Sequence, residues 1–167
     1  FFGAPSGVMA ARTSWEEGSD SNTAIAFMKM SERFFGAHTH YDAGSFQFYY
    51  RGMLAIDSGA YISYNTPHYL NYSSATVSHN CMLVDDPNEY IKELNNDGGQ
   101  RLLPKQQYSP VTLQELQSDT YRTSKIIGYD YGPDLNTPEY SYFEGDISYA
   151  YTDKVKNYTR SFMFLNL

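Results

Sequence analysis

The sequence contains a single cysteine, Cys81, and few basic residues. One cysteine excludes an internal disulfide, and it gives no indication of the cellular compartment. No apolar run is long enough to resemble a membrane span, so we expect no membrane partner. The 12 Lys and Arg against 19 Asp and Glu give a formal net charge of −7. We therefore expect no nucleic-acid partner, because phosphate binding depends on clustered Lys and Arg.

Aromatic residues are abundant, with 17 Tyr and 10 Phe in 167 residues. Tyr and Phe favour half-buried β-sheet surfaces, and they also stack on flat ligands such as sugar rings. The net charge opposes an anionic ligand unless a local basic cluster overrides it, and Arg33, Arg51 and Arg101 are the candidates for one.

The length indicates one domain, and the apolar content of 41% is enough for an ordinary core. The chain opens without an initiator Met or a signal peptide and stops inside an apolar run. We expect residues 1–167 to form a single β-sandwich domain, incomplete at both ends, within a longer polypeptide.

Short runs of aromatic and aliphatic residues, separated by Gly, Ser, Asn and Asp, predict an all-β fold. Many short strands with turn signals between them favour an antiparallel β-sandwich. From Asp85 to Thr120 the pattern is polar, and we expect a loop with a turn at Asn95–Gly99 and one short helix at Gln114–Gln117. The predicted strands are Val8–Trp15, Ala24–Met30, Ser45–Tyr50, Met53–Ile56, Cys81–Val84, Ser124–Tyr129, Asp146–Tyr151 and Thr159–Leu165.

Arg51 and Gly52 separate two of these runs, as in a two-residue β-hairpin with Gly available for positive φ. The two strands are therefore expected to pair antiparallel. That pairing would bring His40, before the first strand, to the same end as Asp57, after the second.

Histidines suggest a metal site at this end. His38 and His40 are two residues apart, so in an extended segment both side chains would point to one side. Asp57 and His79 could join them, and imidazoles with a carboxylate are a ligand set that suits zinc and similar divalent ions. His-x-His also occurs on surfaces without any metal.

Five motifs follow one another along the chain in a distinctive order. They are Ala11-Arg-Thr-Ser-Trp15, His38-Thr-His-Tyr-Asp-Ala-Gly-Ser-Phe46, Gly52-Met-Leu-Ala-Ile-Asp-Ser-Gly-Ala-Tyr61, Thr76-Val-Ser-His-Asn80 and Asp146-Ile-Ser-Tyr-Ala-Tyr151. Together these motifs resemble the heparinase II/III family of polysaccharide lyases. Within the family, the resemblance is strongest to the heparinase II branch, through Phe1–Pro5, Met28–Met30, Asp42–Gln47 and Pro67-His68.

The resemblance implies a β-sandwich joined to an N-terminal α/α toroid, which would be this domain's partner in the same protein. It implies a structural zinc ion held by His40, Asp57 and His79. It further implies catalytic roles for His38, facing the substrate, and for Tyr64, lining the cleft. Because the segment from Tyr61 to His68 is shorter than in heparinase II, Tyr61, Tyr69 or Tyr72 could substitute for Tyr64.

The function that follows is β-elimination of a uronic-acid polysaccharide, with heparin or heparan sulfate as the anionic substrate. We expect a periplasmic or secreted bacterial enzyme, inactive as residues 1–167 alone, with a second copy of the chain as a further candidate partner. Rival interpretations are an alginate or oligoalginate lyase, a metal-stabilised carbohydrate-binding module without catalysis, and a cupin-like metal oxygenase.

Some residue roles stay open at the level of sequence. His38 could orient His40 by hydrogen bonding instead of meeting the substrate. Asp42 could support a ring nitrogen or replace Asp57 as a ligand. Asn80 could fix the backbone beside His79, and Cys81 could bind metal, although a cysteine opening a strand is more often a core residue.

Overall fold

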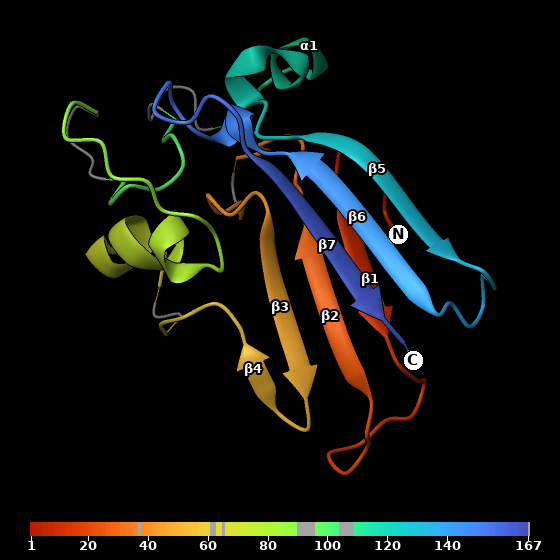
Figure 1. Ribbon diagram of the computed structural model, residues 1–167. Helices are drawn as coiled ribbons and strands as arrows, with labels where there is room; N and C mark the ends of the chain where they lie inside the picture. Colours follow the sequence, from red (N-terminus) through yellow and green to blue (C-terminus); the bar gives the residue numbers. More distant parts are fainter. Residues whose placement is uncertain (37, 61–62, 65, 90–95, 104–108, 167) are drawn as a thin grey trace.

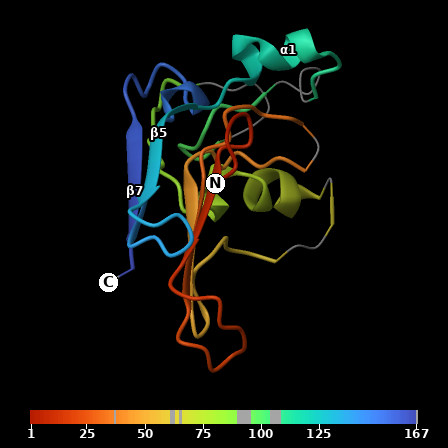
Figure 2. The same ribbon diagram turned by 90° about the vertical axis from the view of Figure 1, so that its right-hand side faces the viewer.

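Two antiparallel β-sheets make up most of the fold. The computed structural model of the chain describes residues 1–36, 38–60, 63–64, 66–89, 96–103 and 109–166. The strands are β1 (Val8–Arg12), β2 (Ala24–Lys29), β3 (Ser45–Tyr50), β4 (Met53–Ala55), β5 (Lys125–Gly132), β6 (Tyr140–Asp146) and β7 (Thr159–Leu165). The first sheet has the order β1-β2-β3-β4 and the second the order β5-β6-β7. Figure 1 shows the strands of each sheet, and Figure 2 shows the two sheets as separate layers facing one another.

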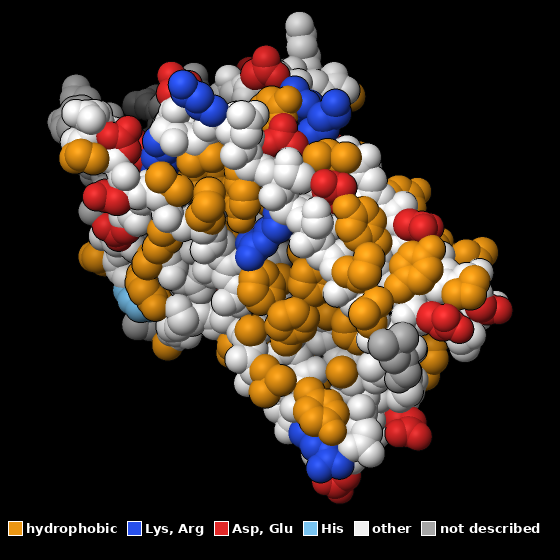
Figure 3. Space-filling model, in the orientation of Figure 1, with side chains coloured by type: hydrophobic (Ala, Val, Ile, Leu, Met, Phe, Trp, Pro, Cys, Tyr) orange, Lys and Arg blue, Asp and Glu red, His pale blue; other side chains and the backbone are white. Residues whose placement is uncertain are grey.

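The main core lies between these layers. Met9 of β1, Met28 of β2 and Phe143 of β6 belong to one apolar cluster, and Phe143 is fully buried. Alternation along each strand places these residues on the inward face. Outward-facing apolar side chains remain on the second sheet, where Met163 is 58% exposed and Leu165 54% exposed. Figure 3 shows apolar side chains gathered over this face.

Helical segments are short. They are η1 (Tyr69–Ser73), η2 (Thr76–Ser78), α1 (Leu113–Gln117), η4 (Asp119–Tyr121) and η5 (Ser148–Ala150). The predicted helix at Gln114–Gln117 is confirmed as α1, which begins with a capping box between Thr112 and Glu115. Within the described residues, every helix is too short or too polar to span a bilayer.

The predicted antiparallel β class is confirmed, and Ser45–Tyr50 and Thr159–Leu165 have the predicted bounds as β3 and β7. Two predicted strands are wrong. Cys81–Val84 is irregular, and within Asp146–Tyr151 only Asp146 is in a strand, because Ser148–Ala150 forms η5. The strand Tyr140–Asp146 was not predicted.

The turn predicted at Asn95–Gly99 is present in its described residues, 96–99. Asn95 lies outside the described residues, but Asp97 and Gly98 both have positive φ. The amide of Gly99 donates to the carbonyl of Asn96 over 2.7 Å, which closes the turn.

The β3–β4 hairpin has the predicted antiparallel pairing, with Phe48 opposite Ala55. The expectation that glycine supplies the positive φ is wrong, because it is Arg51 that has φ +53°. A register shift between Phe48 and Tyr49 adjusts the strand pairing next to the turn. The hairpin therefore brings the start of β3 and the end of β4 together.

Candidate metal centre

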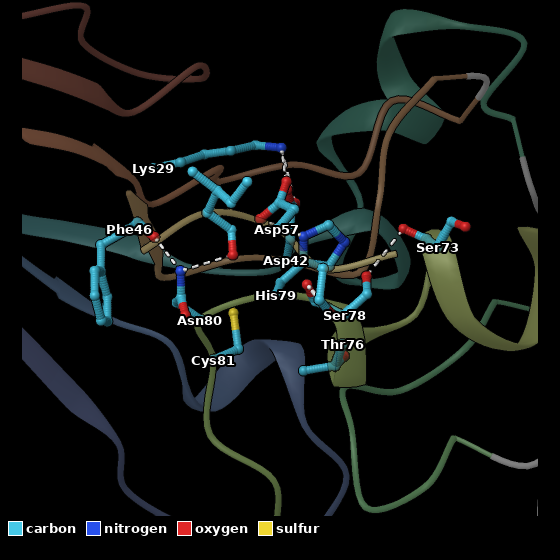
Figure 4. A network of polar contacts seen from close by, with 12 residues as sticks. Lys29, Asp42, Phe46, Asp57, Ser73, Thr76, Ser78, His79, Asn80 and Cys81 are labelled. Atoms are coloured by element: carbon cyan, nitrogen blue, oxygen red, sulfur yellow. Dashed lines mark hydrogen bonds and ion pairs between the residues drawn. The ribbon is translucent and has the colours of Figure 1, made fainter. Parts of the chain in front are cut away.

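Three segments meet where the β3–β4 hairpin begins and ends. His40 and Asp42 precede β3, Asp57 follows β4, and His79 follows η2. The amide of His79 donates to the carbonyl of Thr76 over 3.0 Å, which ends the helix and turns the imidazole inward. Figure 4 shows His79 beside Asp42 and Asp57.

His40, Asp42 and His79 form a compact group in which one ligand atom from each residue lies within 4.8 Å of the others. The rings of His40 and His79 have centroids 5.1 Å apart. The structure therefore brings together the two predicted histidine ligands. It supplies Asp42, an alternative ligand at the level of sequence, as the carboxylate of this group.

Asp57, the predicted carboxylate ligand, also reaches the site. Its Oδ1 lies 2.9 Å from Nδ1 of His79. At this distance the two atoms are ion-pair partners, although the contact lacks the geometry of an aligned hydrogen bond. The contact brings together a carboxylate oxygen and an imidazole nitrogen, which are both atom types that bind zinc.

The two aspartates differ in their surroundings. Both carboxylate oxygens of Asp42 lie 2.8 Å from Nζ of Lys29, whose charge competes with any cation for them. Asp57 has no such lysine contact among the described residues. Asp42 belongs to the compact ligand group and is also paired with Lys29, whereas Asp57 is paired with His79.

His79 provides the main test of whether a metal fits. Its side chain is 0% exposed, and neither Nδ1 nor Nε2 has a hydrogen-bond partner within the described part of the chain. Nδ1 has the Asp57 carboxylate 2.9 Å away, whereas Nε2 makes no hydrogen bond within the described residues, and a buried polar atom left in that state costs roughly 1–3 kcal/mol. A divalent ion bound by this imidazole would remove that cost, so the residues fit the group.

Electrostatics favour the forms that bind metal. Burial lowers the pKa of His40, and the neighbouring His79 lowers it further, which favours the neutral imidazole. Burial alone would raise the pKa of Asp57, but contact with His79 outweighs it and the pKa of Asp57 is lowered. A neutral imidazole and an ionised carboxylate are the states that coordinate a cation.

His38 and Tyr64 form a pair next to this group. Tyr64 Oη lies 2.8 Å from His38 Nδ1, and Tyr64 is 48% exposed. The expected extended geometry around His38 is wrong, because this residue has φ +68°. His38 therefore contacts Tyr64, whereas His40 packs against His79 and Tyr69.

The other candidate tyrosines have different surroundings. Tyr61 lies outside the described residues. Tyr69 is 6% exposed, so it is a packing residue, and Tyr72 Oη lies 2.7 Å from Ser58 Oγ. Tyr64 is thus the tyrosine of this segment that is both exposed and bonded to His38.

Residues that flank the ligands fix the backbone. Asn80 Nδ2 donates to the carbonyl of Phe46 over 2.9 Å, as its predicted role requires. Burial raises the pKa of the Cys81 thiol to about 12, and its Sγ donates to the carbonyl of Ala43. Cys81 is therefore a packing residue, as expected, and the compact ligand group consists of His40, Asp42 and His79.

Gln100 and Lys29 were not predicted as parts of the site. The Gln100 side chain accepts from the amide of Ala43 over 3.1 Å and donates to its carbonyl over 2.8 Å. It thereby holds the segment that carries Asp42. No local motif marks either residue, because both act on residues that are distant along the chain.

The three arginines that were candidates for a basic cluster have two different sets of partners. Arg51, in the β3–β4 turn, donates to Asn22. Arg33 donates to the carbonyl of Ser118, and Arg101 donates to the carbonyls of residues 119, 120, 122 and 149. Arg33 and Arg101 therefore hold the same segment, residues 118–122, whereas Arg51 acts elsewhere.

Comparison with known families gives one match. Residues 9–128 match the family model described as heparinase II/III-like, C-terminal. This region covers most of the chain and includes His38, His40, Asp57, Tyr64 and His79. No curated protein matches the sequence.

Proposed function

The chain belongs to the heparinase II/III-like C-terminal family, and on that premise we propose that it is the metal-stabilised β-domain of an enzyme that cleaves heparin or heparan sulfate by β-elimination. Family membership itself gives a polysaccharide lyase context. In the proposal the domain acts with an α/α toroid of the same protein in the periplasm or outside the cell. Within the family, the motifs at Phe1–Pro5 and Asp42–Gln47 favour an enzyme similar to heparinase II.

The observation that carries the proposal is the fully buried His79 side chain, whose ring nitrogens make no hydrogen bond within the described residues, beside His40, Asp42 and Asp57. Imidazole and carboxylate donors suit zinc. The residues that would hold the ion are His40, His79 and Asp57, with Asp42 as the alternative carboxylate. When bound, the ion would connect the segment before β3, the residue after β4 and the end of η2, which stabilises this end of the fold.

His38 and Tyr64 would perform the chemistry at the domain's surface. In β-elimination a base removes the proton on carbon 5 of the uronic acid, the bond from carbon 4 to its oxygen breaks, and an acid protonates that oxygen. Negative charge grows on the adjacent carboxylate, and preorganised hydrogen-bond donors stabilise it. His38 would supply such a donor.

Tyr64 would act as base and then as acid. A phenol has an ordinary pKa of about 10 and is a weak base in water, but a neighbouring donor stabilises its deprotonated form. The 2.8 Å contact between Tyr64 Oη and His38 Nδ1 supports this pairing. Further catalytic groups would come from the toroid, so we expect no turnover by residues 1–167 alone.

A second candidate substrate is alginate, a uronic-acid polymer without sulfate. The net charge is −7, and Arg33, Arg51 and Arg101 are each engaged by neighbouring backbone or Asn22. These features favour a less sulfated polymer, whereas the motifs shared with the heparinase II branch favour heparan sulfate. Assays of the complete enzyme on both polymers, following the unsaturated product, would distinguish them.

Elemental analysis of the purified protein tests the metal centre. We expect one zinc per chain in the wild type and loss of zinc in His40→Ala and in His79→Ala. His68→Ala is the matched control, because His68 stacks on Tyr72 outside the ligand group, and it should retain zinc. A wild type without metal, or metal retained in both ligand variants, would contradict the proposal.

A further inference from the structure

Tyr69 lies between the candidate metal group and the His38–Tyr64 pair. Its ring centroid is 6.1 Å from that of His40 and 5.4 Å from that of Tyr64, and both contacts are edge-to-face. Tyr69 is 6% exposed. One buried ring therefore touches a candidate metal ligand on one side and the candidate catalytic phenol on the other.

The backbone of Tyr69 is firmly held. Its amide donates to Thr66 Oγ1 over 3.2 Å. Its carbonyl accepts from the amide of Ser74 over 3.0 Å and from Ser74 Oγ over 2.9 Å. Tyr69 also begins η1, a single π-helical turn, and such turns occur frequently at functional sites.

The two neighbours of this ring are less enclosed than Tyr69 itself. His40 is half-buried, and Tyr64 is 48% exposed. An ion held jointly by His40 and His79 would fix the His40 ring. Because packed side chains transmit restraint through contact, the effect on Tyr64 would pass through Tyr69.

We propose that Tyr69 is a positioning residue that couples metal binding at His40 and His79 to the placement of the Tyr64 phenol. This inference rests on the proposed function, because it takes both the metal centre and the role of Tyr64 from it. It explains how an ion that does not touch the substrate can still affect catalysis. The ion would orient His40, the His40 ring would confine Tyr69, and Tyr69 would hold Tyr64 against His38.

A zinc titration of protein with ¹³C-labelled tyrosine rings tests the coupling by NMR. The Tyr64 signal is identified by its loss in Tyr64→Phe, and zinc binding is measured separately by competition with a chelating dye. Zinc is diamagnetic, so shift changes report altered ring surroundings. We expect the Tyr64 signal to move in step with zinc binding in the wild type.

Two substitutions of Tyr69 show whether the ring carries the effect. Tyr69→Phe keeps the ring, and the zinc-dependent shift of Tyr64 should persist. Tyr69→Leu removes the ring, so zinc should still bind while the shift of Tyr64 loses most of its size. If Tyr69 only supported the fold, Tyr69→Leu would weaken zinc binding and the Tyr64 shift together.

The outcomes separate this inference from the proposed function. If zinc binds and the Tyr64 signal stays unchanged in the wild type, the coupling is wrong and the metal centre stands. An undiminished response in Tyr69→Leu would also overturn the role of Tyr69. Absence of zinc binding would overturn the coupling and the metal centre together. The wild-type titration tests the coupling even if Tyr69→Leu fails to fold.

Discussion

At the scale of single residues, His79 combines complete burial of its side chain with two ring nitrogens that lack hydrogen bonds in the described structure. In a protein interior such a residue is costly, since a buried donor or acceptor without a partner retains its desolvation penalty. The neighbouring carboxylates already have partners, because Asp42 is paired with Lys29 and Asp57 with His79. An ion at this site would therefore act mainly by giving the His79 ring a ligand bond in place of its missing hydrogen bonds.

Gly44 is required for two reasons, its positive φ and the close packing of Ile147 against its backbone. It has φ +82°, and a Cβ at this position would lie 2.2 Å from Cδ1 of Ile147. We expect Gly44→Ala to lower the free energy of unfolding by about 2–4 kcal/mol, because left-handed backbone strain and overpacking add together. Urea denaturation followed by circular dichroism measures this.

Gly18→Ala separates the two contributions. Gly18 has φ +103°, but nothing lies within 4 Å of an added Cβ. The control therefore keeps the backbone cost, roughly 1–2 kcal/mol, and lacks the overlap. Equal losses in the two variants would show that Ile147 moves aside without cost.

At the scale of elements, the irregular segment after His79 is tied to the loop before β7. Glu89 forms a buried ion pair with Lys154, and the two side chains are 8% and 2% exposed. Thr152 Oγ1 donates to the same carboxylate over 2.7 Å. This segment lacks the predicted strand between Cys81 and Val84. It is held by these side-chain contacts together with single backbone hydrogen bonds, such as the one from the Val84 amide to the Gly98 carbonyl over 2.8 Å.

We expect Glu89→Gln to reduce the free energy of unfolding by about 3–5 kcal/mol, because Lys154 is left buried without its counter-ion. The measurement is urea unfolding at neutral pH. The matched control is Asp119→Asn, since the Asp119 side chain is 96% exposed and 4.0 Å from Arg122. It should change stability by less than about 0.5 kcal/mol.

The same carboxylate predicts a pH dependence. Burial alone would raise the pKa of Glu89, but hydrogen bonds from Lys154, Thr152 and Asn96 outweigh it, so the pKa is lowered from 4.5. A lowered pKa in the folded state stabilises the protein above the unfolded value, and this stabilisation is lost as pH falls through the folded pKa. The gap between wild type and Glu89→Gln should therefore narrow below pH 4.5; a gap independent of pH would refute the ion pair's role.

The local sequence pattern predicted some strands correctly, but it failed where contacts between distant residues determine the secondary structure. β3 and β7 have strongly apolar sequences, and their predicted bounds were correct. β6 was missed because its inward residues are Ser141, Phe143 and Gly145, and Gly145 is required only because Met30 packs against it. The apolar run after Asp146 forms η5 instead of a strand, since Asp146 Oδ1 accepts from the amide of Ser148 over 2.9 Å.

At the scale of the whole molecule, the site depends on segments that the β3–β4 hairpin brings together. The sequence predicted the meeting of His40 and Asp57, because an antiparallel hairpin requires it. His79 was proposed from its residue type and from the family resemblance, without a hairpin to place it, and the structure brings it beside both residues. Two contacts could not be predicted, those of Lys29 with Asp42 and of Gln100 with Ala43. Sequence spacing does not show how segments that are distant along the chain pack together.

Zinc should therefore stabilise the whole domain and not only its own site. Binding to the folded state alone adds about 2.7 kcal/mol when free ligand is 100 times the Kd. For a domain of this size that corresponds to a rise in Tm of roughly 5–10 °C. Thermal unfolding with excess zinc, compared with unfolding in EDTA, measures the difference.

Two controls make this result specific to the candidate centre. Magnesium prefers oxygen ligands and octahedral geometry, so it should leave Tm unchanged at the same concentration. His40→Ala and His79→Ala should unfold at the same temperature in zinc as in EDTA. If both variants keep the full zinc-dependent rise, the stabilising ion is bound elsewhere, and the convergence of three segments at the hairpin is a matter of packing alone.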